Sequence, residues 1–229
     1  MNKFKGIDPD GIMLLAENRF NDSKIFYDAH KAEIKNKVIL PLYDLISDLT
    51  PLLSKTDDKM NLIPSKMVSR VRRDTRFSKD KMMYRENLWI MFMRNKHEWK
   101  YLQPCMWFEF TPAGYNYGVG LFNCEPKVMQ CFRKHLDEKG EEFLKAVKPI
   151  EKIKIKPSFE RYKKDRSMGK DERLKLYYNA KEIYFISEPK PLQGLFDGTC
   201  VEEIKEAIKA FTPMYNFLLG ITEELINEA

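Results

Sequence analysis

The stretch of sequence that decides the fold is residues 106–121, which read MWFEFTPAGYNYGVGL. Every second position is apolar or aromatic on both sides of Pro112-Ala113-Gly114: Met106, Phe108 and Phe110 before it, and Tyr115, Tyr117, Val119 and Leu121 after it. Two runs with a period of two around a Pro/Gly break predict a β-hairpin. Gly118 and Gly120 inside the second run indicate either a bulge or the close approach of another backbone.

The sequence on either side of this hairpin predicts helices near both ends of the chain. Phe26, His30, Ile34 and Val38 recur at helical spacing, after a cap at Asp22 or Ser23. Pro41 either kinks this helix or begins a new one, and Pro213 is expected to interrupt the last helix. Short apolar runs at 88–93 and 182–186 add strands.

Four further segments carry specific expectations: residues 54–65 read as a loop, 141–147 as a separate short helix, 153–156 as an edge strand and 170–180 as a helix. We therefore expect a single α+β domain over residues 1–229. Its central, mainly antiparallel sheet would contain the hairpin near 105–121, packed by N-terminal and C-terminal helices.

The composition excludes several classes of protein. Of the 229 residues, 43% are hydrophobic and 13% aromatic, which disordered chains lack. No apolar run approaches the roughly 18 residues that a membrane-spanning helix needs, and residues 1–10 contain no apolar leader segment. We expect a cytoplasmic protein without a membrane partner.

The cysteines and histidines give no metal or cofactor signal. The four cysteines, Cys105, Cys124, Cys131 and Cys200, show no Cys-x-x-Cys spacing, and the three histidines are scattered. A free cysteine is most often a small core residue. We therefore expect reduced, structural thiols, no metal site and no cofactor.

Charge is concentrated in one part of the chain. The formal net charge is +6, yet residues 66–100 alone hold eleven basic and four acidic residues, a surplus of seven. A local cluster of one sign raises the local concentration of the other and favours an anionic partner. The alternative is that these lysines and arginines solvate a surface and pair with neighbouring carboxylates.

The densest chemistry lies in residues 73–85, which we call the basic segment. Guanidinium, ammonium and hydroxyl groups here would hold a phosphate or carboxylate, and a tyrosine would stack on a base. The candidate ligand-binding residues are Arg73, Arg76, Ser78, Lys79, Lys81, Tyr84 and Arg85. Asp74 and Asp80 are candidates for structural ion pairs, which we expect as Arg73–Asp74 and Arg76–Asp80.

The basic segment resembles the signature of the domain of unknown function 2461 family. That family carries Arg-Asp-Thr-Arg-Phe-Ser-Lys-Asp-Lys and then Pro-Tyr-Lys, which stand here as Arg73–Lys81 and Met83-Tyr84-Arg85. Its Asn-Asn-x-x-Trp-Phe-x-x-x-Lys pattern is matched by Asn21, Asp22, Phe26 and Lys31, and its Gly-Leu-Tyr and Glu-Pro elements are echoed at 120–122 and 125–126. The resemblance implies an intracellular α+β domain with no assigned activity. Met83 replaces a proline of the family pattern, so the turn after Lys81 is expected to differ.

Three functions compete for the basic segment. The preferred one is binding of an anionic small molecule or nucleotide, with Phe77, Trp89 and Trp99 as further aromatics nearby; nucleic acid is a weaker fit. The second is an enzyme that acts on a phosphorylated or carboxylated metabolite, with Asp74 or Asp80 as general base. Flanking arginines oppose that role because they keep a carboxylate ionised. The third is a structural or interaction protein in which the segment is an internal ion-pair network. The oligomeric state stays open.

Overall fold

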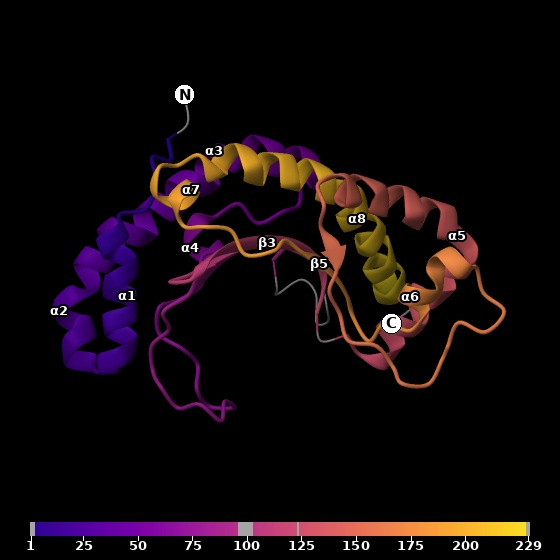
Figure 1. Cartoon of the computed structure of the whole chain (residues 1–229), viewed down its shortest axis with the longest axis horizontal. Helices are drawn as coiled ribbons and strands as arrows, with labels where there is room; N and C mark the ends of the chain where they lie inside the picture. The colour runs from indigo at the N-terminus through magenta and orange to yellow at the C-terminus, as the bar shows by residue number, and fades with distance from the viewer. Residues whose placement is uncertain (1–2, 96–102, 123, 228–229) are drawn as a thin grey trace. The chain divides into compact units, whose positions relative to one another are not determined.

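The computed structural model describes residues 3–95, 103–122 and 124–227 (Figure 1). The elements in chain order are α1 (Pro9–Asn21), α2 (Lys24–Ile34), the π-helix η1 (Lys35–Ile39), α3 (Leu40–Thr56), α4 (Pro64–Met67), β1 (Leu88–Phe92), β2 (Cys105–Thr111), β3 (Gly114–Leu121), α5 (Pro126–Lys152), β4 (Lys156–Pro157), the 3₁₀ turn η2 (Glu172–Leu174), α6 (Lys175–Tyr178), β5 (Ile183–Ile186), α7 (Gln193–Phe196) and α8 (Cys200–Asn227). Helices and one antiparallel sheet confirm the predicted α+β class.

The five strands follow the order β1-β2-β3-β5-β4. The predicted hairpin is β2 and β3, and β5 pairs antiparallel with β3, so that Gly118 faces Ile186 and Leu121 faces Ile183. At Gly120 a Cβ would lie 2.3 Å from the carbonyl oxygen of Ile183, which confirms the close backbone approach expected there. The edge strand predicted at 153–156 is displaced: residues 153–154 form a turn, and β4 at the edge of the sheet begins at Lys156.

The chain divides into two compact units, each assembled from three segments. Unit 1 comprises residues 1–92, 107–116 and 189–205, and unit 2 comprises 93–106, 117–188 and 206–229. The expectation of one domain over residues 1–229 stays a prediction. The core of unit 1 includes Leu42, Leu45 and Ile46 of α3 together with Phe108 and Phe110 of β2, all fully buried. In unit 2, the Phe143 ring packs edge-on against Tyr177 at a centroid distance of 4.6 Å and against Phe217 at 5.3 Å.

Of the two expectations at prolines, one is confirmed and one is wrong. Pro41 is the second residue of α3, the new helix expected there, which η1 joins to α2. Pro213 does not interrupt α8. Phe211, Met214 and Tyr215 around it are at most 1% exposed, and burial on this scale outweighs the one backbone hydrogen bond that proline removes.

The expected break before the helix at 141–147 is confirmed: the φ of −130° at Lys139 is not helical, and this kink divides α5 into two helical segments, the second of which extends to Lys152. Two segment boundaries differ from expectation. The predicted helix at 170–180 is reduced to η2 and α6, and α3 extends into the predicted loop as far as Thr56. No described helix combines the length and apolar character that crossing a bilayer requires.

Candidate functional site

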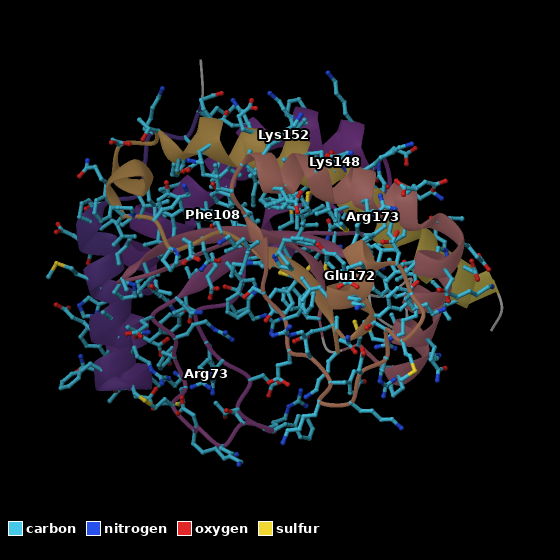
Figure 2. The ribbon with its side chains drawn as sticks, turned by 45° about the vertical axis from the view of Figure 1, so that its right-hand side comes forward. Arg73, Phe108, Lys148, Lys152, Glu172 and Arg173 are labelled. Atoms are coloured by element: carbon cyan, nitrogen blue, oxygen red, sulfur yellow. The ribbon has the colours of Figure 1, made fainter. Side chains whose placement is uncertain are left out.

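The basic segment is a long loop closed at its base by backbone pairing within unit 1. The amide of Ser69 donates to the Trp89 carbonyl at 2.9 Å, and further along the Arg73 amide donates to the Met83 carbonyl at 2.7 Å. An isolated bridge also joins Arg72 to Tyr84. Figure 1 shows the loop in purple, and Figure 2 labels Arg73 on it. The residues between 73 and 83 therefore start from a fixed base, although they form neither helix nor strand.

Asp80 is the centre of an ion-pair cluster inside this loop. Its Oδ2 accepts from Arg73 Nη1 at 2.5 Å and from Arg19 Nη2 at 2.8 Å. Its Oδ1 accepts from the Met82 amide at 3.0 Å. Arg73 also donates from Nη2 to Ser78 Oγ at 3.2 Å. Two guanidinium groups thus share one carboxylate, with the Arg73 side chain 19% exposed and that of Arg19 23% exposed.

Helix α1 and the residue that ends it hold the far side of the loop. Arg19 Nη1 donates to the Tyr84 carbonyl at 2.8 Å. Asp22, the C-cap of α1 with a positive φ of 43°, accepts from the amides of Met83 at 2.6 Å and Tyr84 at 3.2 Å through Oδ1. The Tyr84 ring is 1% exposed and stacks on Tyr27 at 4.9 Å. Tyr84 is therefore a packing residue here, and its ring has no free face for a ligand.

The outer part of the loop contains a separate, exposed pair. Arg76 donates from Nε and Nη2 to the two oxygens of Asp74 at 3.0 and 2.7 Å, and Lys81 Nζ donates to the Thr75 carbonyl at 3.0 Å. Phe77 beside them is 95% exposed. Lys79 is exposed, and no described residue forms an ion pair or hydrogen bond with its ammonium group.

Arg85 follows the loop and differs from its neighbours. Its guanidinium carbon lies 4.5 Å from the centroid of the Trp89 ring, a cation–π contact. Its Nε is buried, and no described residue accepts a hydrogen bond from it. Burial lowers the pKa of Arg85, the charge of Arg73 lowers it further, and Glu109 opposes both. Arg85 is thus a half-buried cation without a hydrogen-bonded carboxylate among the described residues.

The acids of the segment are unsuited to general-base catalysis. Hydrogen bonds from the Arg76 side chain and amide lower the pKa of Asp74 from 3.8 to about 2. Arg19, the Met82 amide and Arg73 together hold the pKa of Asp80 well below its ordinary value. A general base works best with a pKa near the operating pH. Both carboxylates therefore act as permanent anions near neutral pH.

The structure brings together part of the predicted site. Arg73, Ser78 and Asp80 meet in one cluster, whereas Arg76 and Asp74 form a pair of their own. The expected pairing, Arg73–Asp74 and Arg76–Asp80, is wrong because the chain doubles back and brings Asp80 to Arg73. Trp99 lies outside the described residues, as do Lys96 and Lys100 of the basic window.

Sequence reasoning missed Arg19 as the second partner of Asp80. No local pattern marks Arg19, which precedes Asp80 by 61 residues. Asp22 could have been identified from the sequence, because it belongs to the family's upstream Asn-Asn-x-x-Trp-Phe-x-x-x-Lys pattern. The structure shows that this motif and the basic segment contact each other through Asp22.

Comparison with known sequences places the chain in a family. The profile described as Conserved hypothetical protein (DUF2461) matches residues 11–217. The chain belongs to this family. The match includes most of α1 and all of the basic segment, and it confirms the resemblance read from residues 73–81. No curated protein and no solved structure matches the chain.

Proposed function

We propose that the protein binds an anionic ligand, bearing a phosphate or carboxylate group, at the basic segment. The ligand would occupy the position beside Arg85 and be contacted from the outer loop by Lys79 and Lys81. The observation that carries this proposal is the state of Arg85: half-buried, stacked on Trp89, and without a carboxylate that accepts a hydrogen bond from it among the described residues.

Local charge balance supports the same position. Arg73 and Arg19 already share the single carboxylate of Asp80, so this cluster retains positive charge. Arg73 also acts on Arg85 strongly enough to lower its pKa. A partly buried cation next to a like charge is stabilised when an anion binds, and the bidentate geometry of a guanidinium matches phosphate and carboxylate oxygens.

The remaining predicted residues take supporting roles in this proposal. Arg73, Ser78 and Asp80 fix the loop, and Tyr84 anchors its return to the core. The internal ion-pair network of the third hypothesis is thus the frame of the proposed site. The enzyme alternative is less favoured because Asp74 and Asp80 are both held ionised by arginines.

Titration calorimetry at low salt tests the proposal, with inorganic phosphate, pyrophosphate, ATP and a dicarboxylate such as succinate as separate probes. Phosphate contacts are strongest at low salt. We expect saturable binding of at least one probe that weakens about 10–100-fold in Arg85→Gln, because a hydrogen bond to a charged group contributes about 1.5–3 kcal/mol. Lys79→Ala should weaken binding less.

Lys55→Ala is the matched control, since Lys55 is an exposed lysine of unit 1 in α3. Its affinity should equal that of the parent protein. Binding that is undetectable with all four probes, or equally weakened in Lys55→Ala and Arg85→Gln, contradicts the proposal. We also propose a cytoplasmic location, which the four free cysteines support because thiols persist in a reducing compartment.

A further inference from the structure

A second group of reactive side chains lies in unit 2, apart from the basic segment in sequence. Cys131 and His135 are four residues apart on α5 and so share a helix face, and Glu224 reaches them from α8. Cys131 is 8% exposed and His135 4%, while the Glu224 side chain is 30% exposed. One donor atom from each of the three residues lies within 4.8 Å of the other two.

The hydrogen bonds fix the orientation of the imidazole. His135 Nδ1 lies 3.1 Å from the carbonyl oxygen of Cys131 and 3.8 Å from its sulfur, and with the hydrogen on Nδ1 the ring donates to that carbonyl. His135 Nε2 then faces Glu224 Oε2 at 3.4 Å. In the neutral ring this nitrogen presents a lone pair to a carboxylate oxygen. This contact is favourable when either a proton on Nε2 or a metal ion lies between the two atoms.

The separation favours a metal ion over a proton. A charge-assisted N–H···O hydrogen bond spans about 2.7–2.9 Å, shorter than the 3.4 Å found here. Two N or O ligands at about 2.0–2.1 Å from a tetrahedral zinc ion are about 3.4 Å apart. The Cys131 sulfur lies 4.0 Å from the other oxygen of the same carboxylate, Glu224 Oε1, so the thiol and the carboxylate are adjacent.

We propose that Cys131, His135 and Glu224 form a zinc(II) site that joins α5 to α8. Thiolate, imidazole and carboxylate together suit this borderline-soft ion. The Nδ1–H bond to the Cys131 carbonyl is the kind of outer contact that orients metal-binding histidines. Lys134 donates to Glu224 Oε1 at 2.9 Å and leaves Oε2 toward the histidine. Three protein ligands leave a fourth position for water.

Metal content and thermal stability of the full chain, purified without an affinity tag, test the site. After treatment with a chelator, the protein should take up one zinc ion per chain in equilibrium dialysis. Its melting temperature should rise by about 5–10 °C at a free zinc concentration about 100-fold above the dissociation constant, because the ion binds only the folded state. Cobalt(II) substitution should give the intense visible bands of a tetrahedral ion and a thiolate charge-transfer band.

Cys131→Ser and Glu224→Gln should each weaken zinc binding by about 100-fold or more, since even outer contacts contribute about 10–100-fold. Cys124→Ser, which alters a partly exposed thiol of unit 2 outside the cluster, should leave it unchanged. Glu224→Gln remains informative if Cys131→Ser does not fold, because Glu224 is partly exposed. Equal zinc binding by the parent and Glu224→Gln, no uptake by the parent, or a cobalt spectrum without the thiolate band overturns the proposal.

Discussion

The amide of Met83 donates to Oδ1 of Asp22 at 2.6 Å, which links the C-terminal end of α1 to the basic segment. The family pattern has proline where this chain has Met83, and a proline has no amide hydrogen to donate. This chain therefore has a contact between its two motifs that the family pattern does not offer. Asp22 accepts from the Tyr84 amide as well.

Asp22→Ala should lower the stability of the protein by about 1–2 kcal/mol, because two partly buried amides lose a charged acceptor. For a chain of this size the melting temperature should fall by about 2–4 °C for each kcal/mol. Met83→Pro should show a smaller loss, since the Tyr84 amide keeps its acceptor. Asn21→Ala, at the exposed neighbouring position, is the control. Equal melting temperatures for Asp22→Ala and Asn21→Ala would count against this role.

Asp80→Asn and Asp74→Asn form a second informative pair. Asp80 is shared by two guanidinium groups and a backbone amide, whereas Asp74 binds an exposed arginine two residues away. Exposed local ion pairs contribute little to stability. We expect Asp80→Asn to lower the melting temperature clearly and Asp74→Asn to leave it almost unchanged. Limited proteolysis should cut the loop faster in Asp80→Asn; equal cutting in the two variants contradicts the cluster's role.

Acid should loosen the basic segment through Asp80. Its pKa is lower in the folded protein than the ordinary 3.8. A group with a depressed folded pKa contributes stability that is present above its unfolded pKa and lost as pH falls through the folded value. The melting temperature should therefore decrease below about pH 4, and the decrease should be smaller in Asp80→Asn. Identical pH profiles for the two proteins would show that other carboxylates dominate acid unfolding.

Two glycines should respond to alanine in opposite directions. A Cβ at Gly120 would lie within 2.5 Å of backbone atoms of Ile183 and Tyr184, which the paired strands cannot move apart easily. Gly120→Ala should destabilise the protein by about 1–3 kcal/mol. Gly220 lies inside α8 with nothing within 4 Å of a built Cβ, so Gly220→Ala should stabilise it by about 0.5–1 kcal/mol. Denaturant unfolding measures the stability of both variants. If Gly120→Ala is as stable as the parent protein, the paired strands can move apart to accept the methyl group, and the prediction is wrong.

The sequence correctly predicts those strands and turns that are determined by local periodicity and by turn-forming residues. The hairpin at 105–121 and the strand at 183–186 are confirmed because a period of two and a Pro/Gly break are local properties. Pro213 shows the limit: its local rule predicts a break, yet the burial of Phe211 and Tyr215 decides the outcome. Burial of that kind depends on segments far away in the sequence.

Side-chain contacts show the same difference between local features, which the sequence reveals, and long-range features, which it does not. The basic segment is visible as a charge cluster, but Arg19 approaches Asp80 from 61 residues away. Cys131 and His135 share a predicted helix, so their i, i+4 spacing was available as a signal. Glu224 lies 93 residues beyond Cys131, and only the tertiary structure shows that it completes the group.

The interleaving of the two units has a consequence for biosynthesis. Unit 1 begins with residues 1–92 but also contains residues 189–205. During translation, the chain must be synthesised as far as residue 205 before this unit has all its parts. The amide of Ile7, for example, donates to the carbonyl of Leu195. Leucines of early helices such as α3 therefore stay exposed until residues 189–205 are made, so we expect contiguous fragments of unit 1 to aggregate.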